Sequence, residues 1–325
     1  MDETTVNNNH ILVKDLKPGF EVLQFFVVSS KETRKTKNGQ DYLNLSLSDM
    51  SGSIIGKIWE NAMKINRLDF ETGDFVKVKG NTQLFGENLQ LNVERIRKSE
   101  ISEIPNLNYL IKKTAFDVEF VCDQIMEDVE HLLPQELSQL VKTLLLRELN
   151  KFKMFPAARK IHHAYIGGLI EHTFTVLTKV KAMTELIPGI NENLAIAGAI
   201  LHDIGKLYEI DPQTKSRTLE GRLKGHVMLG LELLRDTAKE LDLLEASWLS
   251  ELEHIMLSHH GELQFGALVK PLTREAILVH FMDNLDSKLK IIDEALEKTD
   301  SKGFSDYNKY LEGRAYAGSH GMTEE

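Results

Sequence analysis

The chain has 325 residues, of which 42% are hydrophobic and 27% charged, and its formal net charge is −10 at pH 7. This composition is typical of a soluble globular protein and excludes disordered, fibrous and membrane-spanning classes. The single cysteine, Cys122, excludes an internal disulfide and favours a reducing compartment such as the cytoplasm. The N-terminus has neither a basic nor an apolar segment, so we expect no secretory signal and no membrane partner.

The acidic excess is unevenly placed along the chain. Residues 1–100 hold 14 Lys/Arg and 14 Asp/Glu, so the later residues carry the whole negative charge. A protein that coats duplex nucleic acid needs clustered basic residues, which this balance does not favour. An acidic segment can still act on nucleic acid if bound cations supply local positive charge.

Residues 10–100 are predicted to form β-strands. Val and Phe are frequent over 21–30, and the basic stretch 31–39 ends in Asn-Gly, which indicates a hairpin. Leucines alternate with polar residues over 43–48, as in a strand with one buried face. The next expected elements are a strand over 53–59, a short helix over 61–67 and strands over 74–79 and 89–96. Five strands with a helix between the third and fourth is the order of the OB-fold, which often binds oligonucleotides.

The strand faces suggest where nucleic acid would bind. If Leu43 and its alternating partners point into the barrel, Tyr42 points outward, and Lys57 and Trp59 share the outer face of the next strand. Aromatic rings stack on bases and lysines contact phosphates. We therefore predict nucleic-acid contacts by these residues: Arg34, Lys35, Lys37, Tyr42, Lys57 and Trp59. The alternatives are that Trp59 closes the bottom of the barrel and that the basic loop is merely solvated.

From about residue 105 the apolar periodicity becomes helical. Apolar residues recur at steps of three and four over 116–133 and 136–149, with prolines at 134 and 156. The predicted organisation is an OB domain (1–104), a helical connector (105–160), a helical third domain (161–300) and a polar C-terminal tail (301–325).

Histidines crowd into the third domain. Nine of the 12 lie between His162 and His280, and buried imidazoles need hydrogen-bond partners or a metal. The polar set, in chain order, is His172, His202, Asp203, His226, His259, His260 and Asp283. His202 and Asp203 end the apolar run 195–201, which predicts a buried helix. Metal ligation explains such polar residues, because a bound cation stabilises otherwise unpaired groups.

This ordered set resembles the signature of the HD superfamily of metal-dependent phosphohydrolases, in its binuclear branch. The resemblance implies one metal on His172, His202, Asp203 and Asp283, and a second on His226, His259 and His260, with Asp203 bridging both. Mixed imidazole and carboxylate ligands suit Mn²⁺ or Fe²⁺. Two such ions lower the pKa of a water molecule and neutralise phosphoryl oxygens. The predicted fold is therefore multidomain α+β, with an N-terminal five-stranded OB-like β-barrel and a C-terminal all-α HD domain.

Further residues near this set have less specific signals. Lys206, one turn after Asp203, is predicted to contact a phosphate, with a surface ion pair as the alternative. His162 and His163 precede two glycines and could contact substrate or serve the structure equally well. His254 and His280 are expected to pack against apolar neighbours or to support the ligands.

The combination of OB-like module, helical connector and binuclear HD domain is similar to the YhaM family of bacterial 3′–5′ exoribonucleases. The segments 162–164, 167–173 and 258–262 carry the likeness, which covers nearly the whole chain. It implies stepwise release of nucleoside 5′-monophosphates from single-stranded RNA, with single-stranded DNA as a further substrate and Mn²⁺ as the favoured metal. A homo-oligomer is compatible with the sequence.

Two alternatives stay open. One is an HD-type small-nucleotide phosphohydrolase acting on a cyclic dinucleotide or a nucleoside triphosphate, although the Gly-Tyr-Pro segment of the cyclic-dinucleotide branch is missing after His260. The other is a non-catalytic nucleic-acid-binding protein that keeps the metal for structure. The complete ligand set speaks against the second alternative, since structural sites need no open coordination position.

Overall fold

The computed structural model describes residues 10–36, 38–86, 88–111, 113–157, 165–211, 217–297 and 303–318. Lys37, His162 and His163 therefore lie outside the described residues. The chain divides into two compact units, a barrel unit that ends at Lys113 and a helical unit that begins at Thr114.

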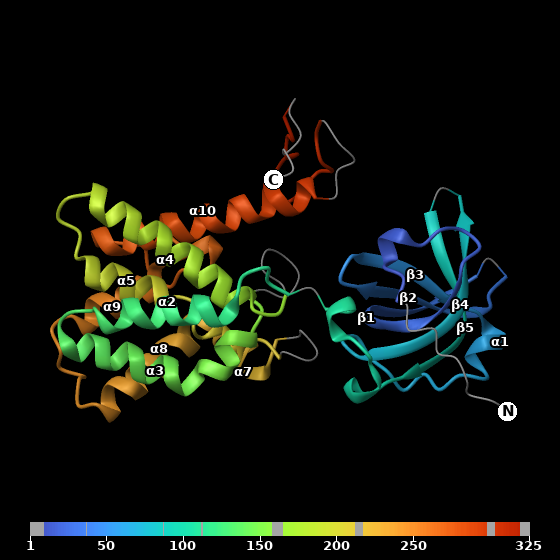
Figure 1. The fold of residues 1–325 in the computed structure, drawn as a ribbon, viewed down its shortest axis with the longest axis horizontal. Coiled ribbons are helices and arrows are strands. Elements are labelled where there is room, and N and C mark those ends of the chain that lie inside the picture. Colours follow the sequence, from blue (N-terminus) through green and yellow to red (C-terminus); the bar gives the residue numbers. More distant parts are fainter. Residues whose placement is uncertain are drawn as a thin grey trace. The chain divides into compact units, whose positions relative to one another are not determined.

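The barrel unit is a closed five-stranded sheet (Figure 1). Its strands are β1 (Glu21–Lys35), β2 (Asp41–Asp49), β3 (Gly52–Ile58), β4 (Phe75–Phe85) and β5 (Asn88–Lys98). They close in the order β1-β2-β3-β5-β4, with β3 and β5 parallel and the other pairs antiparallel. A short helix, α1 (Glu60–Met63), lies between β3 and β4. This topology confirms the predicted OB-like barrel.

Alternation of apolar and polar residues builds the barrel core. Leu43, Leu45 and Leu47 of β2 are buried, and Ile54 and Ile58 of β3 are buried beside them. Tyr42 and Lys57 are half-buried on the opposite face, and Trp59 follows β3 with 39% of its surface exposed. The predicted inward and outward faces of both strands are therefore correct.

The first hairpin is longer than the sequence suggested. Strand β1 continues to Lys35, where the register pairs Lys35 with Asp41, so the predicted loop at 31–39 is mostly strand. Backbone pairing with β2 outweighs the low strand propensity of the charged residues. Lys31 lies in β1 and is part of the barrel. Its ammonium donates to the carbonyl oxygens of Leu68 and Phe70 and so does not extend freely into solvent.

The helical unit contains the rest of the helices. These are α2 (Val118–Glu130), α3 (Gln135–Met154), α4 (Gly168–Leu186), α5 (Glu192–Leu201), α6 (Lys206–Glu209), α7 (Leu219–Leu223), α8 (Gly225–Glu240), α9 (Leu249–Ser258) and α10 (Arg274–Leu296). Asp117, Asn191 and Thr273 cap α2, α5 and α10 by accepting hydrogen bonds from backbone amides of the first turn. The predicted all-α character of this part of the chain is confirmed.

Helix α5 is the centre of the helical unit, and residues 194–201 are all buried. It contacts α4, α9 and α10, and Figure 1 shows α10 running beside α4. Helices α2 and α3 share this core, in which Cys122 is buried, although the sequence suggested a connector there. The exact domain boundaries stay a prediction.

In the described part of the chain, no helix combines the length and apolar character that crossing a bilayer requires.

Candidate metal centre

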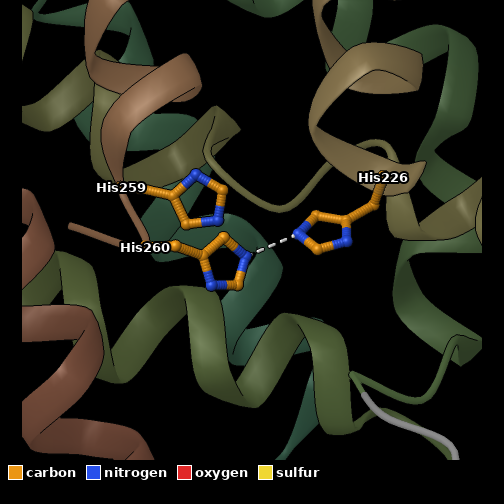
Figure 2. A group of neighbouring side chains, drawn as sticks. All are labelled: His226, His259 and His260. Atoms are coloured by element: carbon orange, nitrogen blue, oxygen red, sulfur yellow. Dashed lines mark hydrogen bonds between the residues drawn. The ribbon is translucent and has the colours of Figure 1, made fainter. Parts of the chain in front are cut away.

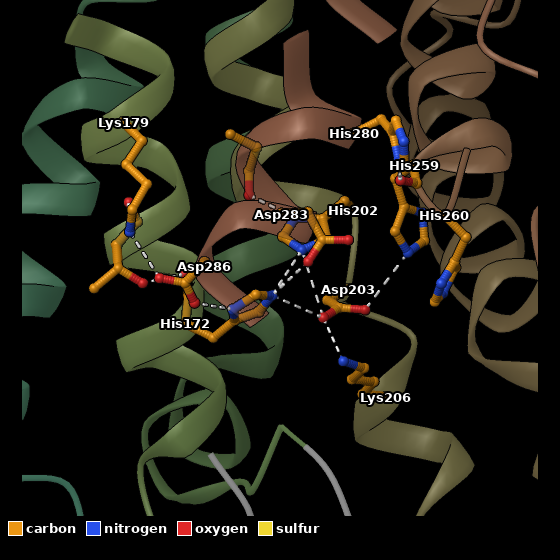
Figure 3. A network of polar contacts seen from close by, with 12 residues as sticks. His172, Lys179, His202, Asp203, Lys206, His259, His260, His280, Asp283 and Asp286 are labelled. Carbon is orange, nitrogen blue, oxygen red and sulfur yellow. Dashed lines mark hydrogen bonds and ion pairs between the residues drawn. The ribbon is translucent and has the colours of Figure 1, made fainter. Parts of the chain in front are cut away.

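Helix ends bring the predicted ligands together around α5 (Figure 3). His202 and His259 are the C-terminal caps of α5 and α9, and Asp203 directly follows His202. His172 and His226 lie near the N-terminal ends of α4 and α8. Asp283 comes from the middle of α10. All seven ligand residues predicted from the sequence therefore lie in one centre.

The first half of this centre consists of His172, His202 and Asp283, whose ligand atoms lie within 4.8 Å of one another. The Nε2 atom of His172 is 3.2 Å from Asp283 Oδ1 and 3.3 Å from His202 Nε2. His172 and His202 are almost fully buried. Two imidazoles and a carboxylate at these distances are a donor set that suits a transition-metal ion.

The second half consists of His226, His259 and His260, again with ligand atoms within 4.8 Å of one another (Figure 2). The Nε2 atoms of His226 and His260 are 2.9 Å apart. The rings of His259 and His260 lie with their centroids 4.2 Å apart. This half has only imidazole ligands of its own.

Asp203 lies between the two halves and faces both (Figure 3). Its Oδ2 atom is 3.4 Å from His172 Nε2 and 3.5 Å from His202 Nε2. Its Oδ1 atom is 3.5 Å from His226 Nε2 and 3.8 Å from His259 Nε2. One carboxylate thus presents a separate oxygen to each half, which is the geometry that a bridging ligand needs.

Hydrogen bonds on the outer side of the rings determine which nitrogen can bind a cation. The Nδ1 atoms of His202 and His259 lie 2.8 Å and 2.7 Å from the carbonyl oxygens of Ala199 and Met256. Because a carbonyl only accepts, each Nδ1 must carry the proton, and each neutral ring then has a lone pair on Nε2. These lone pairs point into the centre.

Two buried atoms in the centre lack a hydrogen-bond partner among the described residues. They are Asp203 Oδ1 and His259 Nε2. An unsatisfied buried acceptor costs free energy that a metal ligand recovers on binding its cation. The residues present therefore fit a bound divalent metal.

The charge state of the centre agrees with this fit. Burial, followed by the neighbouring His260 and His202, lowers the pKa of His259, and burial with His226 lowers the pKa of His260 to about 4. Both rings are neutral at pH 7 and keep their lone pairs. Burial lowers the pKa of His172, but hydrogen bonds with Asp203 and other carboxylates outweigh it and raise that pKa. A proton on His172 therefore competes with a cation for the Nε2 atom, which faces Asp203 and Asp283.

The remaining predicted residues of the helical unit have other partners. Lys206 pairs with Asp203 Oδ2, but both side chains are mostly buried, so this is not the surface ion pair of the alternative, and phosphate contact by Lys206 stays a prediction. His280 supports a ligand, since its Nδ1 lies 2.7 Å from the carbonyl oxygen of His259. His254 accepts a hydrogen bond from the backbone amide of Leu272.

Three of the predicted nucleic-acid residues of the barrel unit form a cluster of partly exposed rings around a lysine. Tyr42 and Trp59 have ring centroids 5.1 Å apart, and the ammonium of Lys57 lies 5.4 Å and 5.6 Å from them. The same ammonium lies 5.0 Å from the ring of Phe85, which is 67% exposed. The sequence prediction missed Phe85, whose only signal was its place beside the β4–β5 hairpin turn.

The two described residues of the predicted basic loop are paired with acids of their own hairpin. Arg34 pairs with Glu32 at 2.7 Å, and Lys35 pairs with Asp41 at 2.8 Å. All four side chains are at least half exposed, so these pairs are weak and can exchange with a phosphate.

Comparison with known proteins assigns both units. Residues 169–288 match the family model of the HD domain, and residues 27–98 match that of the OB-fold nucleic acid binding domain. The solved structures that are similar include a domain of replication protein A from Methanococcus maripaludis, at 22% identity and a TM-score of 0.24, covering 28% of this chain and 94% of that one. The second OB-fold domain of the same protein gives 23% identity and a TM-score of 0.23, with the same coverage. Both are too distant to transfer a function.

The chain therefore carries an HD domain and an OB-fold nucleic-acid-binding domain. An HD domain indicates a metal-dependent phosphohydrolase, and its combination with an OB-fold domain supports a nucleic-acid hydrolase.

Proposed function

We propose that this chain is a metal-dependent 3′–5′ exonuclease that hydrolyses single-stranded RNA, and also single-stranded DNA, to nucleoside 5′-monophosphates in the cytoplasm. The observation that carries the proposal is the arrangement of Asp203, with one oxygen toward each half of a seven-ligand centre. The OB-fold domain in the same chain supports a polymeric rather than a small substrate.

The centre would hold two divalent ions, with Mn²⁺ favoured by the mixed imidazole and carboxylate donors. His172, His202 and Asp283 would hold one ion, and His226, His259 and His260 the other, with Asp203 bridging. When bound, such ions would polarise a phosphodiester as Lewis acids and would lower the pKa of water, so that hydroxide is available as a nucleophile at neutral pH.

Lys206 has a role of its own in this proposal. Its ammonium pairs with Asp203, and both side chains are mostly buried. Cations on Asp203 would take over the charge that Lys206 now neutralises. The ammonium, one helical turn away, would then be free to orient a non-bridging phosphate oxygen of the terminal nucleotide.

The barrel unit supplies features that suit a single strand. The ring cluster of Tyr42, Trp59 and Phe85 offers faces on which successive bases can stack, and Lys57 at its centre can contact a phosphate. On the outer face of β4 and β5, Lys79 lies opposite Arg95, whereas Arg97, opposite Lys77, is already paired with Glu103. Like charges in directly opposed positions destabilise a sheet, and an anionic backbone would relieve that repulsion.

The proposal is tested with a 5′-labelled single-stranded RNA and Mn²⁺-loaded protein. The expected result is a descending ladder from the 3′ end and release of nucleoside 5′-monophosphates. Asp203→Ala should abolish this release and leave RNA binding by the barrel unit within about twofold, because the substitution is in the other unit. Glu240→Gln, an exposed carboxylate on α8 paired with Arg147, is the matched control and should cleave normally.

Other outcomes would contradict the proposal. Hydrolysis of cyclic dinucleotides or nucleoside triphosphates with the RNA left intact would favour a small-nucleotide hydrolase. RNA binding without turnover in Mn²⁺-replete buffer would favour a binding protein with a structural metal.

A further inference from the structure

Four of the histidines in the metal centre donate their Nδ1 proton outward, but they use two different kinds of acceptor. His202 and His259 end their helices, where the last carbonyl oxygens have no intrahelical partner. Each ring donates to the carbonyl three residues before it, that of Ala199 or Met256. The backbone of α5 and α9 therefore orients these two rings.

His172 and His226 have no such backbone acceptor. His226 lies in the first turn of α8 and His172 begins the second turn of α4, where the backbone carbonyls are engaged in the helix and are not free acceptors. A side chain must supply the acceptor. His172 Nδ1 lies 2.7 Å from Asp286 Oδ2, and His226 Nδ1 lies 3.0 Å from Glu209 Oε2.

Each of these carboxylates is buried and is held by a cation. Asp286 is 6% exposed, and its Oδ1 accepts from Lys179 at 2.7 Å (Figure 3). Glu209 is 5% exposed, and its Oε1 lies 3.1 Å from Arg217 Nε. Fixed in this way, a carboxylate holds the ring orientation and raises the basicity of the Nε2 atom on the inner side.

We infer that Asp286 and Glu209 are positioning residues, each of which sets the metal affinity of one half of the centre. Asp286 acts through His172 on the half that contains His202 and Asp283. Glu209 acts through His226 on the half that contains His259 and His260. The inference rests on the metal binding of the proposed function and adds that the two halves can be weakened separately.

The geometry gives a reason for separate control. The two carboxylates approach the centre from different elements, α10 and α6, and among the described residues each contacts a histidine ring of only one half. The first half has Asp283 in addition to the shared Asp203, whereas the second half has imidazoles and the shared carboxylate alone. The loss of Glu209 should therefore cost the second half more than the loss of Asp286 costs the first.

The experiment measures Mn²⁺ binding by the full chain, with calorimetry for affinity and electron paramagnetic resonance for the coupled ion pair. Wild type should bind two ions. Asp286→Asn and Glu209→Gln should each weaken one binding event by about 10- to 100-fold. The double variant should weaken each event by the factor found in the corresponding single variant, so the overall constant for binding two ions should fall by the product of the two factors. Asp286→Glu, which keeps the charge, should recover part of the affinity, and Glu240→Gln should bind like wild type.

These measurements distinguish the loss of ring positioning from misfolding, and metal binding from RNA cleavage. Circular dichroism of the metal-free proteins checks that the variants fold. In each single variant, unchanged binding by the half that was not altered shows that the centre is still folded. Wild-type affinity in both single variants, or loss of the same event in both, would overturn the inference. Two bound ions in a wild type that leaves RNA uncut would overturn the proposed function and leave this inference intact.

Discussion

Replacing Gly205 by alanine tests how closely the two halves of the metal centre depend on helix packing. Gly205 follows Asp203 by two residues, and a Cβ atom there would lie 2.0 Å from the carbonyl oxygen of His226 and 2.4 Å from the amide nitrogen of Gly230. Side-chain carbons do not approach other heavy atoms within 3.0 Å. Both obstacles are backbone atoms of α8, so no side-chain rotation relieves the clash.

The size of the effect follows from this geometry. Increasing the shortest contact from 2.0 Å to 3.0 Å requires α8 to move by about 1 Å. Overpacking of this kind costs about 3 kcal/mol, which lowers the Tm of a unit of this size by about 6–12 °C. The shift also carries His226 away from Asp203 Oδ1, now 3.5 Å from its Nε2, so Mn²⁺ binding by the second half should weaken and binding by the first should persist.

Thermal unfolding followed by circular dichroism and calorimetric titration with Mn²⁺ measure the two effects. Gly52→Ala is the matched control, because the nearest atom to its added Cβ is Val13 Cγ1 at 3.9 Å. That variant should have the Tm and the Mn²⁺ affinity of the wild type. A Gly205→Ala protein with an unchanged Tm and two undiminished binding events would refute the reasoning.

Three further predictions concern the barrel unit. Burial raises the pKa of Asp49, but hydrogen bonds from His10, Ser51 and Val13 outweigh it and lower that pKa. The stabilisation is therefore present above the unfolded pKa of about 4 and is lost as the pH falls through the lowered folded pKa. Asp49→Asn should cost about 2 kcal/mol at pH 7 and flatten the acid limb of a denaturant-stability profile; an unchanged acid limb would count against this. Phe85→Ala should weaken single-stranded RNA binding by about 5- to 150-fold in fluorescence anisotropy, whereas Phe304→Ala, an exposed aromatic of the helical unit, should have no effect. Lys79→Gln with Arg95→Gln should reduce the slope of log affinity against log salt by about 2, and an unaltered slope would remove this face from the interface.

Periodicity and spacing predicted most of the fold, because the features concerned are local in sequence. Alternation at Leu43, Leu45 and Leu47 fixes the faces of β2, and the apolar run that ends at His202 fixes α5 as the buried helix. The seven ligand positions were recognisable because a family pattern names them in order. Their convergence is a property of tertiary structure that spacing alone does not contain.

The supporting residues could not be read from the sequence with the same ease. Asp286 lies 114 residues from His172, and no local pattern joins them. Its one signal is a position three residues after Asp283, on the same side of a predicted helix. Glu209 and Phe85 likewise acquire their neighbours only through chain folding. Lys31 was expected in a loop, since a basic run looks the same whether its ammonium groups face solvent or bind the backbone carbonyls of the segment between α1 and β4.

Imidazole nitrogens and carboxylate oxygens converge in one centre of the helical unit. Protons and metal ions would compete there for the same nitrogen and oxygen atoms. A cation that binds the first half would have to displace the proton on His172, so acid would release that metal and the metal would release acid. If the centre binds metal as proposed, metal would also shift the folding equilibrium of this unit, by an amount that grows with the logarithm of its concentration, and would leave the barrel unit unaffected. A chelator would then lower the melting temperature of the helical unit and leave that of the barrel unit unchanged.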